Sequence, residues 1–125
     1  MSQARRKNPE EVLQRHVANY LRLALPEGCG VPWTAVEAAG RGGRDGARQK
    51  AKGVRPGFPD LQFILPPHGR FLGIELKAGA PQSKSQQARE AEIATAGGFY
   101  HIARSVREVD SILREHGVEP KVRGL

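Results

Sequence analysis

The first apolar pattern along the chain repeats at helical spacing. Asn8 precedes the pattern and suits an N-cap, and Pro9 suits the first helical position. Pro26 and Gly28 follow the last apolar residue and end the pattern. These residues predict an amphipathic helix from Pro9 to about Leu25. Its buried stripe would consist of Leu13, Val17, Tyr20, Leu21 and Ala24.

Two short apolar segments in the middle of the chain predict a β-hairpin. They are Leu61–Leu65 and Phe71–Leu76, separated by the helix-breaking sequence Pro-Pro-His-Gly. If residues 66–69 form the loop, Leu65 pairs with Arg70. Asp60 then lies opposite Glu75, and directly opposed Cβ atoms are roughly 5 Å apart. A loop longer by one residue would put the two carboxylates on opposite faces.

The remaining pattern completes one α/β domain of 125 residues. It predicts a strand over 31–38, a helix from Ser83 or Ser85 to Ala96, a strand over 99–103 and a helix from 105 to about 116. The Ala-rich helix ending at Ala96 would approach a sheet closely, and the last helix would bury Val109, Ile112 and Leu113. We expect three antiparallel strands, a further strand after the helix, and helices on both faces. Residues 1–8 and 118–125 are expected to be mobile tails.

Charge and cysteine content narrow the class of protein. The 20 Lys and Arg residues exceed the 13 Asp and Glu residues, so the net charge is +7. This balance favours a polyanionic partner, most simply nucleic acid, although a ribosome-associated or membrane-surface protein would share it. One cysteine excludes a disulfide framework and a Cys-based zinc site, and the four histidines are dispersed without ligand spacing. No apolar run is long enough to span a membrane, and no signal peptide is present, so we expect a soluble intracellular protein.

A glycine-rich basic segment precedes the hairpin. Residues 40–56 lack apolar periodicity and cannot bury a face, so we expect a loop that is mobile when free. The segment is either a solvated loop or a loop that orders on a nucleic-acid backbone; the second interpretation is favoured, because it directly precedes Asp60. Lys84, at the start of the helix that ends at Ala96, is one further candidate. The candidate phosphate contacts are Arg41, Arg44, Arg48, Lys50, Lys52, Arg55 and Lys84.

The ends of the hairpin carry the candidate chemistry. Asp60 and Glu75 would be neighbours, and Lys77 would project from the same face as Glu75. Two adjacent carboxylates repel unless a positive charge lies between them, and Lys77 or a divalent metal could supply it. The alternative is a cross-strand salt-bridge cluster, which would contribute only about 0–1 kcal/mol.

These residues resemble the PD-(D/E)XK nuclease motif. Pro59-Asp60 is followed fifteen residues later by Glu75-Leu76-Lys77. The surroundings resemble the VRR-NUC branch, which has a Glu on its opening helix, G-x-P-D, E-L-K and S-x-x-Q. The matching residues are Glu11, Gly57 to Asp60, Glu75 to Lys77, and Ser83 to Gln86, with a later G-strand-R-S segment at Gly98 to Ser105. The resemblance covers about residues 9–113.

The resemblance implies a restriction-endonuclease-like fold, a central mixed sheet flanked by helices. It also implies a Mg²⁺ or Mn²⁺ ion held by Asp60, Glu75 and the main-chain carbonyl of Leu76. Lys77 would hold or deprotonate the attacking water or stabilise the phosphate, and Gln86 would orient water or a phosphate oxygen. Glu11 would help to bind the metal, or would only cap the helix through Asn8.

The implied function is a metal-dependent endonuclease that hydrolyses DNA and is structure-specific for branched DNA such as four-way (Holliday) junctions. Resemblance to small stand-alone proteins of phages and bacteria implies action in the bacterial cytoplasm. One active site per chain implies a homodimer with twofold symmetry if two strands are cut. The alternative from another class is a non-catalytic nucleic-acid-binding module whose acidic cluster is structural. A third, a basic RNA- or ribosome-associated protein, predicts no affinity for metal.

Overall fold

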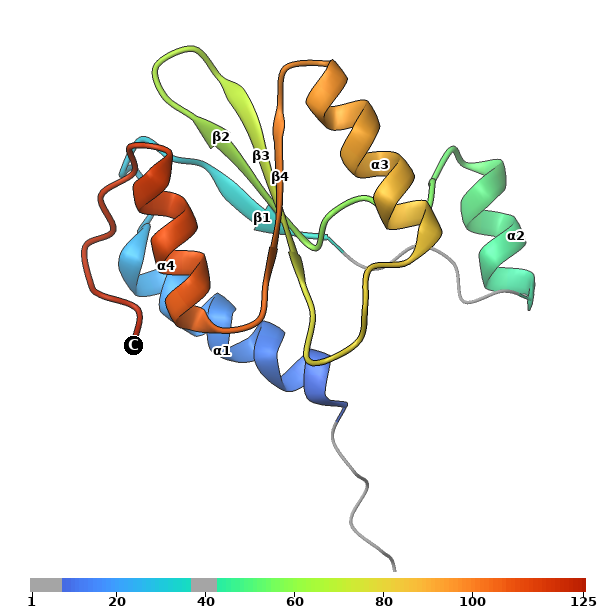
Figure 1. Cartoon of the computed structure of the whole chain (residues 1–125), viewed down its shortest axis with the longest axis horizontal. Coiled ribbons are helices and arrows are strands. Elements are labelled where there is room, and N and C mark those ends of the chain that lie inside the picture. Colours follow the sequence, from blue (N-terminus) through green and yellow to red (C-terminus); the bar gives the residue numbers. More distant parts are fainter. Residues whose placement is uncertain (1–7, 37–42) are drawn as a thin grey trace, which may run out of the picture.

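The computed structural model describes residues 8–36 and 43–125, with the side chains of residues 43–45 left aside. Helices are interspersed among the strands along the chain and flank the one sheet that the strands form (Figure 1). Within the described ranges no helix is long and apolar enough to cross a membrane. The elements are α1 (Pro9–Ala24), β1 (Trp33–Ala35), α2 (Gly43–Ala51), β2 (Leu61–Leu65), β3 (Arg70–Leu76), α3 (Lys84–Thr95), β4 (Phe99–Ala103) and α4 (Val106–Glu115).

The sheet has the order β1-β2-β3-β4. The first three strands are antiparallel, and β4 joins β3 in parallel after the connection through α3. This is the predicted mixed sheet, because a parallel neighbour needs a crossover segment such as a helix. Strand β1 is shorter than the predicted 31–38. It covers residues 33–35, and residues 37 and 38 lie outside the described part of the chain.

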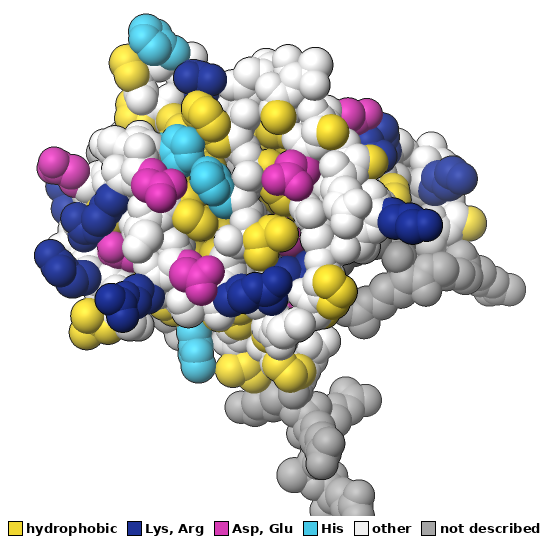
Figure 2. Space-filling view, viewed as in Figure 1, with side chains coloured by type: hydrophobic (Ala, Val, Ile, Leu, Met, Phe, Trp, Pro, Cys, Tyr) yellow, Lys and Arg dark blue, Asp and Glu magenta, His cyan; other side chains and the backbone are white. Residues whose placement is uncertain are grey.

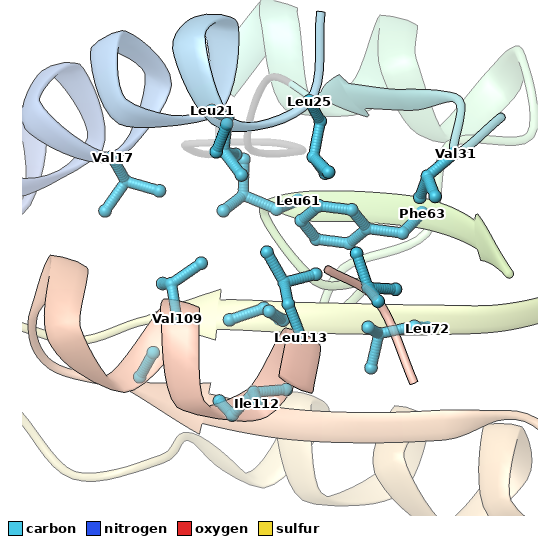
Figure 3. Close-up of a cluster of buried hydrophobic side chains, with 14 of the residues drawn as sticks. Val17, Leu21, Leu25, Val31, Leu61, Phe63, Leu72, Val109, Ile112 and Leu113 are labelled. Carbon is cyan, nitrogen blue, oxygen red and sulfur yellow. The ribbon is translucent and has the colours of Figure 1, made fainter. Parts of the chain in front are cut away.

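One face of the sheet carries the hydrophobic core. The predicted stripes of α1 and α4 pack there against alternate residues of the strands, and Leu21, Phe63 and Leu113 point toward one another in Figure 3. Helix α1 buries Val17, Tyr20, Leu21 and Ala24, and α4 buries Val109, Ile112 and Leu113. The other face is covered by α3, which has no fully buried residue. That face is therefore the more open one.

The segment predicted as a mobile loop over 40–56 contains a helix, so that prediction was wrong for residues 43–51. Arg, Ala, Gln and Lys are good helix formers and no proline interrupts them. The missing apolar periodicity indicated a helix without a buried face, not the absence of a helix. Figure 1 shows α2 on the side of the molecule where α3 lies. Arg89 of α3 donates to the carbonyl of Pro56 at 3.1 Å, which ties the end of this segment to α3.

The C-terminal segment 118–125 is also bound to the fold, against the prediction of a mobile tail. Val118 is buried, and the N–H of Lys121 donates to the carbonyl of Ala24 at 2.8 Å. The N–H of Gly124 donates to the buried carboxylate of Asp110 at 2.8 Å. The short segment holds few apolar residues, so its sequence carried little sign of these backbone contacts.

Candidate active site

The hairpin register brings the two predicted carboxylates together. Leu65 pairs with Arg70 and Leu61 with Ile74, as the four-residue loop requires. Continuing the same register by one step puts Asp60 opposite Glu75, on the face that α3 covers. The backbone of Asp60 is fixed by the N–H of Val36, which donates to its carbonyl at 2.8 Å. Its Oδ2 accepts the N–H of Leu76 at 2.8 Å, which holds the carboxylate against β3.

Two glycines allow the loop that leads to Asp60 to pack closely against α3 and β3. A Cβ at Gly57 would lie 2.3 Å from the carbonyl oxygen of Ser85 in α3, and Gly57 has φ of +93°. A Cβ at Gly73 of β3 would lie 2.2 Å from Cγ of Pro59. The loop is thus held between α3 and β3, and only glycine allows both approaches.

Gly57→Ala should therefore destabilise the protein more than Gly28→Ala. Both glycines have positive φ, but nothing lies within 4 Å of a Cβ at Gly28. The left-handed conformation alone costs alanine about 1–2 kcal/mol, and the clash with Ser85 should add about 1–3 kcal/mol. Urea unfolding of both variants measures the difference. Equal losses of free energy would show that the loop does not need this close approach.

Glu75 is buried, with 5% of its surface exposed, and α3 holds one of its oxygens. The side-chain N–H of Gln86 donates to Oε2 of Glu75 at 2.8 Å. The carbonyl oxygen of the same amide accepts the N–H of Ser83 at 2.8 Å, and Ser83 Oγ accepts the N–H of Gln86. This capping box at the start of α3 fixes the amide with its nitrogen toward Glu75. Ser83, not Ser85, is thus the N-cap.

The other oxygen of Glu75 finds no donor. Oε1 is buried and has no hydrogen-bond partner among the described residues. Burial, followed by the charge of Asp60 and a hydrogen bond shared with its side chain, raises the pKa of Glu75 to about 8. Burial likewise raises the pKa of Asp60. The pair can therefore be satisfied by one shared proton or by a cation.

Lys77 is a positive charge that acts on both carboxylates. It is buried, with 7% of its surface exposed, and its charge partly offsets the rise that burial causes in the pKa of Asp60 and of Glu75. Its N–H donates to the carbonyl of Ala103 at 3.0 Å, which fixes its backbone beside β4. Within the described part of the chain it makes no ion pair with either carboxylate. The alternative of a cross-strand salt-bridge cluster thus finds no support.

The raised pKa of Glu75 gives a pH dependence with a definite sign. Below its ordinary value of 4.5, Glu75 is protonated in both the folded and the unfolded chain. As the pH rises toward 8, only the unfolded chain loses this proton, so the free energy of unfolding falls by about 1.4 kcal/mol per pH unit at most. Glu75→Gln in EDTA should therefore gain stability over the wild type as the pH rises, and the exposed Glu119→Gln should not. Urea unfolding from pH 4 to pH 9 checks this, and parallel curves for wild type and Glu75→Gln would contradict it.

Helix α1 brings a different glutamate toward the site than predicted. Glu11 is 60% exposed and pairs with Arg15 at 3.1 Å, and the Asn8 side chain accepts the N–H of Glu10. Among the described residues Glu11 therefore forms no capping box with Asn8, and its side chain is turned to solvent and to Arg15. The charge of Glu10 raises the pKa of Asp60. The helical phase contained this signal, because Glu10 lies seven residues before the buried Val17, two turns away on the same face of the helix.

Tyr100 of β4 is a second neighbour that the sequence analysis missed. It is buried, and burial, followed by the charge of Glu75, raises its pKa. The pairing of Tyr100 with Gly73 puts it on the carboxylate face. The strand was predicted, but its register with β3 was not, so the sequence did not reveal this proximity.

The predicted phosphate contacts whose side chains the structure describes are all exposed: Arg48, Lys50, Lys52, Arg55 and Lys84. Figure 2 shows Lys and Arg side chains over α2, on the side of α3. Arg55 forms an ion pair with Glu92 at 3.2 Å, so part of its charge is already neutralised. Arg41 and the side chain of Arg44 lie outside the described residues. The exposed candidates for phosphate contacts that make no ion pair within the described ranges are Arg48, Lys50, Lys52 and Lys84.

Comparison with known proteins gives a likeness in structure alone. No protein-family model and no curated protein matches the sequence. A solved structure described as "VRR_NUC domain protein" matches with a TM-score of 0.67 and 20% identity, over 92% of this chain and 93% of that one. A second, described as "VRR_NUC domain", matches with a TM-score of 0.54 and 21% identity, over 88% of this chain and 98% of that one. The resemblance inferred from the motifs is thus confirmed for the fold, and the chain has the restriction-endonuclease-like α/β fold of VRR-NUC domains.

Proposed function

We propose that the protein is a metal-dependent endonuclease that hydrolyses DNA phosphodiester bonds. The observation that carries the proposal is the buried Oε1 of Glu75, which has no donor in the part of the chain that the structure describes and lies beside the carboxylate of Asp60. A fold alone does not imply function. Two adjacent buried carboxylates, one with an unpaired oxygen, lower the stability of the folded chain. A divalent cation bound between them would remove this destabilisation.

The donor set fits Mg²⁺ or Mn²⁺, which prefer carboxylate and carbonyl oxygens. Asp60 and Glu75 would hold the ion, with the carbonyl of Leu76 as the third ligand that the family resemblance implies. When bound, such an ion neutralises phosphate charge and acidifies water. Glu10 takes the place that the sequence analysis gave to Glu11, as the acid of α1 whose charge reaches Asp60.

The chain's own groups have separable roles in the proposed hydrolysis. Lys77 would hold the attacking water or neutralise the charge that develops on the phosphate, because it is buried beside both carboxylates. Gln86 would act on Glu75, since its amide holds Oε2 and leaves Oε1 free for the ion. Gln86 is therefore proposed as a positioning residue, a narrower role than orienting water or phosphate directly.

The exposed basic residues of the α2 segment would contact the DNA backbone. Lys50→Ala and Lys52→Ala should each weaken DNA binding for every sequence alike and reduce the dependence of log Kd on log salt by about one unit. Fluorescence anisotropy at several salt concentrations measures both effects. The exposed Lys121→Ala, on the C-terminal segment, is the control that should leave the slope unchanged. An unchanged slope in Lys50→Ala and Lys52→Ala would remove this segment from the interface.

Branched DNA, such as the four-way junction, is the proposed substrate, and a twofold homodimer is the proposed active form. The support for both is the family resemblance, together with the geometric need for two active sites to cut two strands. Light scattering with and without DNA tests the dimer. A monomer under both conditions would contradict it.

The second candidate is a non-catalytic nucleic-acid-binding module. The sequence identity to the solved neighbours is low, so the shared fold does not decide between a nuclease and a binding module. Labelled linear, flap and four-way DNA incubated with Mg²⁺ or Mn²⁺, and with EDTA, separates the two. Metal-dependent cleavage that is faster than in buffer without the protein supports the nuclease. Binding without cleavage of any of these DNA substrates supports the binding module.

A further inference from the structure

Two of the histidines that the sequence analysis set aside meet a glutamate on the opposite face of the sheet. Nε2 of His101 lies 2.9 Å from Nε2 of His116. A carboxylate oxygen of Glu115 joins them, and the ligand atoms of all three residues lie within 4.8 Å of one another. His101 is on β4, while Glu115 ends α4 and His116 caps it. Fifteen residues separate the two histidines, so spacing along the chain could not reveal the cluster.

The cluster is independent of the carboxylate pair. His101 pairs with Ile74, whose side chain is in the core, so His101 lies on the face of α1 and α4. Glu75 is the next residue on β3 and points to the other face. Figure 2 shows adjoining histidine side chains at the surface with an acidic side chain beside them. The cluster is therefore open to solvent, with Glu115 exposed and both histidines half-buried.

Packing fixes the rings and limits the charge they can carry. The Phe99 ring lies 4.3 Å from that of His116. The guanidinium of Arg70 stacks over Phe99 at 4.3 Å and donates to the carbonyl of Gly97, so a fixed positive charge lies nearby. Two facing Nε2 atoms can share only one proton between neutral rings. The arrangement thus offers two imidazole rings and one carboxylate as ligands, and binding of an ion by both Nε2 atoms would require the ring that holds the shared proton to carry it on Nδ1 instead.

We propose that His101, Glu115 and His116 bind a divalent transition-metal ion of the Zn²⁺ class. Zn²⁺ takes imidazole nitrogen and carboxylate oxygen, at about 2.0–2.1 Å from nitrogen, which separates two tetrahedral ligand atoms by about 3.3 Å. The observed 2.9 Å needs to open by only a few tenths of an ångström. Mg²⁺ is excluded from this site by its preference for oxygen, and Ni²⁺ and Cu²⁺ share the preference for imidazole.

The ion would join the end of α4 to β4. Three protein ligands leave a fourth tetrahedral position for water or another donor. The bond would link an edge strand to the helix that closes the core, so binding should raise the stability of the folded chain. This site takes no part in the proposed cleavage, and it stands whether or not the protein is a nuclease.

The test is metal binding to the full chain after treatment with EDTA. Titration with Zn²⁺ in excess Mg²⁺ should give one bound ion per chain and a higher Tm, and Co²⁺ should give the visible absorption of a tetrahedral site. Zn²⁺ binding should persist in Glu75→Gln, which removes one ligand of the other proposed site. It should weaken at least about 10-fold in His116→Gln and in the surface variant Glu115→Gln.

The matched control is His68→Gln, at the exposed hairpin tip, which should bind as the wild type does. Absence of Zn²⁺ uptake and of the Co²⁺ band in the wild-type chain would overturn the proposal. Unchanged affinity in both Glu115→Gln and His116→Gln would also overturn it. Because Glu115 is exposed, its variant keeps the test valid even if His116→Gln fails to fold.

Discussion

Asp60→Asn is expected to abolish metal-dependent DNA cleavage while leaving the protein as stable as the wild type or more so. The substitution keeps an oxygen that can accept the N–H of Leu76, which now donates to Oδ2 at 2.8 Å. It removes a charge that Glu75 must face, and that charge raises the pKa of Glu75. In EDTA at pH 8 the free energy of unfolding should therefore rise by about 1 kcal/mol or more.

Cleavage should fall at least about 10³-fold, because a carboxylate ligand of a catalytic cation supplies several kcal/mol of charge stabilisation. Single-turnover cleavage of labelled DNA and urea unfolding measure the two effects on the same preparation. DNA affinity in EDTA should stay within about twofold, since Asp60 is not a proposed phosphate contact. A variant that still cleaves at a rate near that of the wild type would refute the assignment of Asp60.

Asp110→Asn should show the opposite pattern. Asp110 is buried in α4 and accepts from Tyr20 at 2.6 Å, Arg114 at 2.8 Å and Gly124 at 2.8 Å. An amide cannot accept all three bonds and carries no charge for Arg114. Arg114 is 42% exposed, so we expect a loss of about 3 kcal/mol, toward the lower end for a broken buried pair.

The pH dependence of this loss follows from the pKa of Asp110. Burial acts to raise this pKa, but the hydrogen bonds from Arg114, Tyr20 and Gly124 outweigh burial and lower it to about 2. The carboxylate therefore stabilises the fold fully above the ordinary value of 3.8, and this stability is lost as the pH falls toward 2. The difference between wild type and Asp110→Asn should shrink over that range. Cleavage per folded molecule should be retained, because α4 lies on the face opposite to Glu75.

The hairpin shows why much of the candidate site could be predicted. Side chains alternate along a strand, so one loop length fixed which residues face each other, and the Leu65–Arg70 pair confirms that loop. The ends of α1 and α4 could likewise be predicted from local apolar spacing and from the capping residues. These features depend on neighbours within a few residues.

Most features that could not be predicted from the sequence depend on contacts between segments that are distant along the chain. Gln86 was selected from the motif, but its bond to Glu75 depends on how α3 meets β3. The histidine cluster needs the end of α4 beside β4, and the C-terminal segment is held through Asp110. Two points could have been judged from local sequence alone. Glu11 was selected from the motif without weighing Glu10, whose charge acts on Asp60. In α2 a polar sequence was equated with a loop.

The most direct measurement of the central claim is Mn²⁺ binding followed by electron paramagnetic resonance at pH 8. The signal of free Mn²⁺ should decrease as the wild-type chain takes up the ion, and Lys77→Met, which keeps both carboxylates, should also take it up. Asp60→Asn and Glu75→Gln should each lose this binding, because each removes one of the two proposed oxygen ligands. Equal Mn²⁺ uptake by the wild type and both carboxylate variants would contradict the account.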